Sequence, residues 1–236
     1  MSKITLVVIL FIFSALFFTV NSANATTSKI GVLAIDNFLM GDVTIPVEVF
    51  GRAIKKEEFS SWDVMVISGS NNKEVVAEEG LKIITDKTIY DDLKLEVLIV
   101  PGAYNIDGFR ENKDLIGFIK KQARSASWMV SNCAGAFLLG AAGVLDGKKA
   151  TTWFGGEESL KEAFPKVDVQ FDQNVVVDDK VITSNGSSVT YQATFELLAK
   201  LSSEKFANEL SESLRFDRLC RAFDNKKKKW KCSTDD

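Results

Sequence analysis

An apolar strand meets an apolar helix within residues 128–139, with a cysteine at the junction. Residues 128–131 are short and apolar, as a buried strand would be, and residues 134–142 are rich in alanine and leucine. A sharp strand-to-helix turn would lift Cys133 out of the sheet and set its sulfur near a helix N-terminus. Because unpaired N–H groups and the helix dipole favour a thiolate there, we expect a lowered pKa and a reactive Cys133.

The composition is that of one globular domain: 236 residues, 46% hydrophobic and 26% charged. Apolar runs that alternate with helical segments predict an α/β fold. The net charge of −3 gives no indication of a nucleic-acid partner. Because the chain has no histidine, a Cys-His or Ser-His pair is excluded, and a zinc site would have only cysteine and carboxylate ligands. We therefore expect no metal site.

The N-terminal residues 1–25 have the pattern of a secretory signal. Residues 4–20 are apolar, and Ala23-Asn24-Ala25 forms a small-x-small cleavage site. We therefore expect an exported protein in the periplasm, the cell exterior or a secretory lumen, where disulfides persist. The alternative is an uncleaved anchor, although the apolar run is short for crossing a bilayer, and only then would the protein contact a membrane.

The C-terminal residues contain two of the three cysteines. Cys220 and Cys232 could form a disulfide, which would leave Cys133 as the free thiol; alternatively, Cys220 is a buried hydrophobe and Cys232 lies on a loose tail. We expect one domain over residues 26–223 and a basic flexible tail over residues 224–236, which is solvated unless it meets an anionic surface.

The hydrophobic pattern predicts further elements on both sides of the cysteine turn. Expected strands cover residues 29–35, 62–68, 74–77, 82–85, 97–100, 149–152, 168–171, 175–177 and 181–183. Expected helices cover residues 42–54, 112–126, 157–164, 187–201 and 204–223. Asp42 is suited to be the N-cap of the first of these helices, and Glu48 further along it to be a solvated or partner-facing charge.

Two motifs carry a family resemblance. Ser131-Asn132-Cys133-Ala134-Gly135-Ala136 and the segment 143–152 resemble the nucleophile region of the DJ-1/ThiJ/PfpI superfamily, which is glutamine-amidotransferase-like. The resemblance covers nearly all of residues 29–215. Residues 164–186 resemble the subgroup of isonitrile hydratases and the sensory halves of AraC-type regulators, without the DNA-binding domain.

The resemblance implies a fold and an assembly. The fold is a flavodoxin-like three-layer sandwich, with a mostly parallel sheet, helices on both faces and a nucleophile elbow at Cys133. Family members are commonly dimers, so we expect a homodimer.

The resemblance also implies roles for individual residues. The Asp42 carboxyl would hydrogen-bond the Cys133 sulfur and transfer protons, and burial would raise its pKa. Backbone N–H groups at Gly102, Ala103 and Ala134 would form an oxyanion site, where a glycine permits close approach. Ala103 stands where the family has a second glycine.

Trp153 stands where many family members have a histidine. The missing imidazole argues against protease and glyoxalase-like mechanisms that need that base. Trp153 and Phe154 would either wall a small apolar pocket or belong to the core.

Three functions remain open at this point. The first is a small-molecule enzyme resembling isonitrile hydratase, in which Cys133 and Asp42 carry out a hydration or hydrolysis; this resemblance also implies no organic cofactor. The second is a redox sensor or small-ligand-binding protein, with an oxidisable Cys133 that forms a sulfinic acid. The third is a structural relative with an unreactive cysteine.

Overall fold

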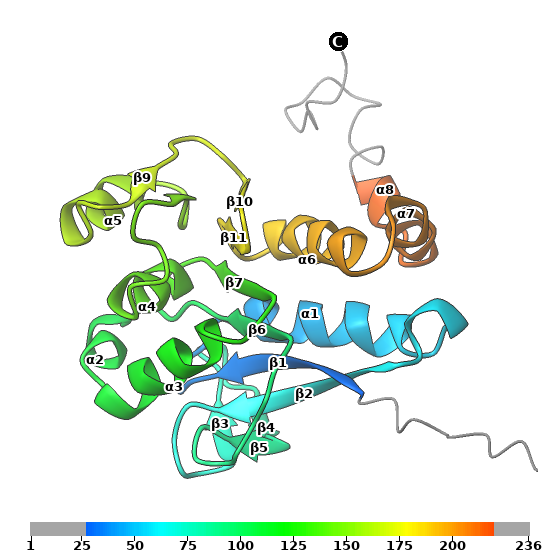
Figure 1. The fold of residues 1–236 in the computed structure, drawn as a ribbon, viewed down its shortest axis with the longest axis horizontal. Helices are drawn as coiled ribbons and strands as arrows, with labels where there is room; N and C mark the ends of the chain where they lie inside the picture. Colours follow the sequence, from blue (N-terminus) through cyan, green and yellow to red (C-terminus); the bar gives the residue numbers. More distant parts are fainter. Residues whose placement is uncertain (1–26, 220–236) are drawn as a thin grey trace, which may run out of the picture.

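A central seven-stranded sheet organises residues 27–219, which are the part of the chain that the computed structural model describes (Figure 1). The expected signal segment, Cys220, Cys232 and the basic tail lie outside these residues. The strand order is β10-β11-β7-β6-β1-β2-β5, and all pairs are parallel except β10 with β11. The strands are β1 (Ser28–Ala34), β2 (Trp62–Ser68), β5 (Lys87–Thr88), β6 (Val97–Val100), β7 (Trp128–Asn132), β10 (Val175–Asp178) and β11 (Val181–Ser184).

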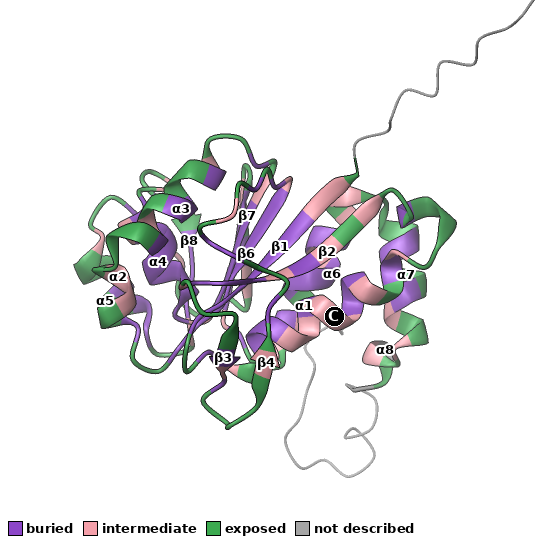
Figure 2. Ribbon diagram, turned by 90° about the horizontal axis from the view of Figure 1, so that it is seen from below, coloured by how far each residue is buried: buried purple, intermediate pink, exposed green. Residues whose placement is uncertain are grey.

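Helices cover both faces of this sheet, as Figure 2 shows. One face carries α1 (Met40–Ala53), α6 (Val189–Leu201), α7 (Glu204–Ser213) and α8 (Phe216–Leu219). The other face carries α2 (Asp107–Arg110), α3 (Lys113–Ala123) and α4 (Gly135–Ala141). The expected mostly parallel, three-layer α/β sandwich is confirmed.

The central strands are apolar because both of their faces are covered. Every residue of β6 is apolar and buried, as an uninterrupted apolar run in a parallel sheet predicts. Every residue of β11 is buried as well, although this strand ends in the polar Thr183 and Ser184. Val100 of β6 pairs with Ser131 of β7, and Asn132 of β7 pairs with Ser184 of β11. The carboxyl ends of three neighbouring strands therefore lie at one edge, where the loops after them meet.

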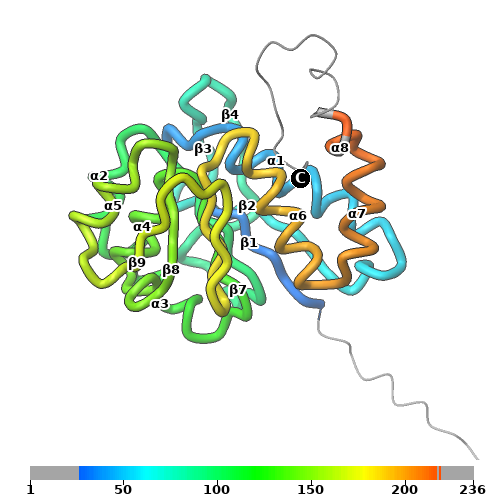
Figure 3. The backbone as a smooth tube through the Cα atoms, turned by 90° about the horizontal axis from the view of Figure 1, so that it is seen from above, coloured from blue at the N-terminus to red at the C-terminus, as the bar shows by residue number. Residues whose placement is uncertain are grey.

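Smaller elements surround the sheet. Strands β3 (Glu74–Val76) and β4 (Lys82–Ile84) form the expected hairpin, and η1 (Glu57–Phe59) follows α1. Strand β8 (Lys149–Ala150) pairs with β9 (Asp168–Val169) in a separate two-stranded sheet, with α5 (Glu157–Ala163) between them in the chain (Figure 3). The strand expected over residues 149–152 is thus shorter than predicted, because Thr151 and Thr152 turn to bond Thr183 and Cys133.

Two expectations about helices need correction. Residues 204–223 were expected to form one helix, but α7 ends at Ser213 and Arg215 adopts a left-handed φ of 61° before α8 begins. Residues 112–126 contain the shorter helix α3, and the short α2 and β5 were not predicted at all.

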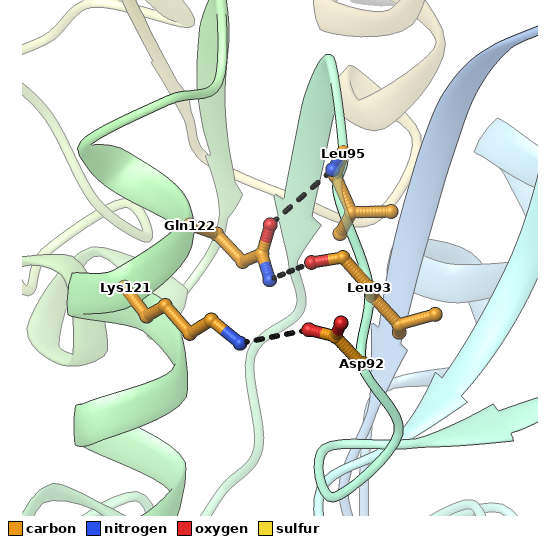
Figure 4. A network of polar contacts seen from close by, with 5 residues as sticks. All are labelled: Asp92, Leu93, Leu95, Lys121 and Gln122. Atoms are coloured by element: carbon orange, nitrogen blue, oxygen red, sulfur yellow. Dashed lines mark hydrogen bonds and ion pairs between the residues drawn. The ribbon is translucent and has the colours of Figure 1, made fainter. Parts of the chain in front are cut away.

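A buried glutamine attaches α3 to the segment before β6. Gln122 Nε2 donates to the Leu93 carbonyl at 2.9 Å, and Leu95 N–H donates to Gln122 Oε1 at 3.3 Å (Figure 4). Lys121 pairs with Asp92 on the exposed side at 3.2 Å. Because buried amides need such partners, Gln122 aligns the entry to the central strand β6.

Candidate active site

Cys133 occupies a strained turn between β7 and α4. Its φ of 51° lies in the left-handed region, which few non-glycine residues adopt. The turn is held from both sides: Cys133 N–H donates to the Ser184 carbonyl at 2.9 Å, and the Cys133 carbonyl accepts from Thr152 Oγ1 at 2.9 Å. The structure therefore has the sharp elbow that the sequence predicts.

Two glycines allow the chain to crowd around this elbow. A Cβ on Gly102 would lie 2.7 Å from Cys133 Cβ and 3.2 Å from Asp42 Oδ2. A Cβ on Gly186, whose φ is 79°, would lie 2.5 Å from Cys133 Cβ and 2.9 Å from Asp42 Oδ1. Gly102 was predicted as a site residue and Gly186 was not. The position of Gly186 two residues after β11, at the same sheet edge as Cys133, is the signal that could have found it.

Asp42 connects three segments of the chain. It is fully buried, and its Oδ2 accepts from Gly102 N–H at 3.0 Å. Its Oδ1 accepts from Ser187 N–H at 3.0 Å and from Thr190 Oγ1 at 3.1 Å. The N-cap interpretation of Asp42 is wrong, because α1 begins earlier and has Leu39 at its N-cap without a side-chain bond.

Burial dominates the ionisation of Asp42. It raises the pKa of this carboxyl from 3.8 to about 6, against the opposing effect of the hydrogen bonds from Gly102, Ser187 and Thr190. The expectation of a raised pKa at Asp42 is confirmed. At neutral pH the carboxyl is mostly ionised.

The thiol of Cys133 behaves differently from its sequence-based prediction. Burial, followed by the negative charge of Asp42, raises the pKa of Cys133 to about 12, while the Ala134 N–H acts to lower it. The expected thiolate is therefore wrong for the resting site with Asp42 ionised: the loss of hydration outweighs what the N–H contributes.

The expected direct bond between Asp42 and Cys133 is also absent from the hydrogen bonds of residues 27–219. The carboxyl accepts from two backbone N–H groups and one hydroxyl instead. Asp42 thus acts on the sulfur through its negative charge and not through a direct hydrogen bond.

The expected oxyanion site is only partly available. Gly102 N–H already donates to Asp42, so it is not free to receive a substrate oxygen. Ala103 forms a β-bridge with Phe38 and lines the cavity described below. The Ala134 N–H lies beside the sulfur and lowers its pKa, so it is the donor best placed to stabilise negative charge there.

A cavity of about 700 Å³ opens beside Cys133. Its walls include the aromatic side chains of Tyr104, Trp153 and Phe154 and the amides of Asn174 and Asn185. The remaining lining residues are Leu39, Ala103, Ile106, Ala134, Gly186, Ser187, Ser188 and Val189. No Lys, Arg, Asp or Glu belongs to this lining, so the cavity suits an uncharged small molecule.

Trp153 serves as both core and wall. Its ring stacks on Phe137 with centroids 5.1 Å apart, and the residue also lines the cavity. Phe154 and Tyr104 are each 79% exposed at the mouth of the cavity. The two interpretations of Trp153 therefore coexist, whereas Phe154 belongs to the pocket rim and not to the core.

Glu48 takes no part in the site. Its Oε2 accepts from the Tyr191 hydroxyl at 2.7 Å, and its Oε1 lies 3.5 Å from Arg52. Over residues 27–219, no three His, Cys, Asp or Glu side chains gather where they could hold a metal ion. Within the same residues, no helix is both long and apolar enough to cross a membrane.

Fold and site together define a class: an α/β sandwich with a cysteine elbow at the carboxyl edge of a parallel sheet and a buried acid beside it. Within that class, the chain belongs to the DJ-1/PfpI family, whose model matches residues 28–200.

The chain is similar in sequence to an enzyme and to a transcriptional regulator, and similar in structure to a solved family member. Isonitrile hydratase from Pseudomonas putida is 30% identical over 160 residues, which are 67% of this chain and 65% of the relative. The HTH-type transcriptional regulator GbdR from Pseudomonas aeruginosa is 24% identical over 83% of this chain and 53% of the regulator. The chain thus spans less than two thirds of either curated relative. The crystal structure of a THiJ/PfpI family protein from Pseudomonas syringae superposes with a TM-score of 0.72 at 22% identity, over 80% of this chain and 75% of that one.

Proposed function

We propose that this protein is an exported cysteine-dependent enzyme that adds water to a small, uncharged electrophile. One observation carries the proposal: the elbow presents Cys133 to a cavity of about 700 Å³, with the ionisable Asp42 buried directly behind it. The similarity to isonitrile hydratase makes isonitriles the first substrates to test.

The reaction would proceed through a covalent adduct. Cys133 Sγ forms a bond to the terminal isonitrile carbon, and the thiol proton passes through a water to the Asp42 carboxylate and then to the same carbon. Water adds to the resulting thioimidate carbon, with one proton going to the nitrogen. The C–S bond then breaks, which releases an N-substituted formamide and restores the thiol.

The experiment is direct detection of the product. The full chain is incubated with a set of alkyl and aryl isonitriles, and formamide is followed by NMR. We expect formamide with the wild type, none with Cys133→Ala, and strongly reduced turnover with Asp42→Asn. Equal product with Cys133→Ala would rule out the cysteine mechanism.

A second candidate is a small-ligand-binding protein without turnover. The observation that favours it is the surroundings of Cys133: no Lys or Arg lines its cavity, and the buried carboxyl of Asp42 lies beside it. Burial and this negative charge raise the pKa of the thiol, and a thiol that keeps its proton is a poor nucleophile. This candidate would be supported if an isonitrile or another neutral ligand shifts the NMR signals of the cavity residues and no formamide forms. The redox-sensor alternative needs a readily oxidised thiolate and is correspondingly disfavoured.

Export and dimer formation belong to the same proposal. The apolar segment 4–20 and the following Ala23-Asn24-Ala25 support a cleaved signal. N-terminal sequencing of the exported protein should begin at Thr26, and retention of Met1 would contradict export by cleavage. Size-exclusion chromatography with light scattering tests the homodimer.

A further inference from the structure

A second cavity lies at the opposite edge of the sheet from Cys133. Met129 and Val181 stand near the starts of β7 and β11 and pair in register, and both line a cavity of about 310 Å³. Cys133 follows the carboxyl end of β7. The two cavities are therefore separated by the length of the strands.

Basic side chains from three segments surround this second cavity. Lys120 and Arg124 come from the end of α3, Lys148 from the turn before β8, and Lys180 from the turn before β11. The single acidic lining residue is Asp179, which binds Lys148 at 2.8 Å. Within residues 27–219, Lys120, Arg124 and Lys180 form no ion pair, so three cations remain available in a chain whose net charge is −3.

The wall between these cations is apolar. It consists of Ala123, Ala126, Met129, Ala142, Val144 and Val181, together with Gly143. Inorganic ions gain nothing from such a surface, whereas an anion with a hydrocarbon body buries apolar area while its head remains at the basic rim.

Helix dipoles do not account for the whole cluster. Cations near the C-terminus of α3 stabilise the helix, which explains Lys120 and Arg124. Lys148 is explained by its ion pair with Asp179, whereas Lys180 comes from a turn, forms no ion pair within residues 27–219 and needs another explanation. The carbonyls near the end of α3 do not oppose an anion strongly, since Arg124 N–H and Ser125 N–H already donate to the carbonyls of Lys121 and Gln122, at 3.3 and 3.0 Å.

We propose that this cavity binds a small soluble carboxylate with an apolar body, such as a medium-chain fatty acid. The volume of about 310 Å³ lies at the small end of the range of ligand pockets, which suits a short chain and not a folded partner. This site is independent of the chemistry at Cys133, and no reaction is assigned to it.

The test uses octanoate as the probe on the full-length chain, followed by calorimetry and by amide chemical shifts. We expect saturable binding that weakens with salt, with shifts at Ala126, Ala142 and Val181. The combined variant Lys120→Gln/Arg124→Gln/Lys180→Gln should weaken binding about tenfold or more. Lys149→Gln, an exposed lysine outside the lining, is the matched control and should change affinity less than about twofold.

Other results would overturn the proposal. Shifts confined to Ala134 and Gly186 would place octanoate in the Cys133 cavity instead. If 1-octanol binds as strongly as octanoate, the cations do not contribute to binding. If inorganic phosphate binds as strongly as octanoate, the apolar wall does not contribute to binding. Unchanged affinity in the combined variant, with its fold verified by circular dichroism, would also contradict the site.

Discussion

The backbone carbonyl of Asp42 accepts a hydrogen bond from Asn132 Nδ2 at 3.3 Å, instead of one from its own helix. The reason is Pro46, which stands four residues later within α1 and has no N–H to donate. Asn132 Oδ1 in turn accepts from Ser184 Oγ at 2.7 Å. A proline in the first helix therefore frees an acceptor that attaches this helix to the residue just before the nucleophile.

Loss of the Asn132 amide should destabilise the fold. Asn132→Ala leaves the Asp42 carbonyl and the Ser184 hydroxyl without their partner inside the core, and we expect a loss of about 1–3 kcal/mol in the free energy of unfolding. Urea denaturation measures it. Asn174→Ala, at an exposed position, is the control and should change stability by less than about 0.5 kcal/mol; an equal loss in both variants would contradict the role of Asn132.

Removal of the Asp42 charge should make Cys133 more reactive. Asp42→Asn keeps the shape of the side chain and removes the second cause of the raised Cys133 pKa, so the pH midpoint of Cys133 alkylation should move downward by about one unit or more. The measurement is the rate of iodoacetamide labelling against pH. Glu48→Gln removes a carboxylate that bonds Tyr191 and should leave the midpoint unchanged. A midpoint that rises in Asp42→Asn would show that the carboxyl favours the thiolate.

Stability should depend on pH through Asp42 in an unusual direction. Since the folded pKa of about 6 exceeds the reference value of 3.8, the folded state binds the proton more tightly, and the contribution of Asp42 falls as the pH rises from about 4 to about 6. When the pH is lowered across that window, the free energy of unfolding of the wild type should therefore increase by about 3 kcal/mol relative to that of Asp42→Asn. Denaturation of both proteins at several pH values measures the difference. A flat difference would mean that Asp42 has an ordinary pKa.

Gly186 should tolerate no side chain. Gly186→Ala adds a Cβ 2.5 Å from Cys133 Cβ at a φ of 79°, and Gly80→Ala has a similar φ of 89° with open space around it. In both variants the left-handed conformation of alanine should lower the free energy of unfolding by about 1 kcal/mol. In Gly186→Ala the steric clash should lower it by at least about 2 kcal/mol more. Thermal unfolding compares them. Equal losses of stability in the two variants would show that the loop after β11 moves to accommodate the added Cβ without destabilising the fold.

The elements that could be predicted were those whose signal is local. A few neighbouring residues are enough to indicate burial or close packing in these elements. Examples are the apolar runs of β6 and β7, the amphipathic pattern of α3 and the small residues after Cys133. The break between α7 and α8 was missed because nothing between Ser213 and Phe216 is a proline or glycine.

The sequence by itself determined the α/β class and the position of the cysteine turn, because strand and helix periodicity and the motif around Cys133 are encoded by adjacent residues. The acid Asp42, which comes from a distant segment, was implied by the family resemblance. Only the tertiary structure decided what these groups do to each other. Gly102, Ser187 and Thr190 are distant in the chain, yet all three donate to Asp42. Desolvation of the sulfur, and not the helix terminus, sets the pKa of Cys133. Burial and charge at a site are sums over residues from many segments, so they exist only once the chain has folded.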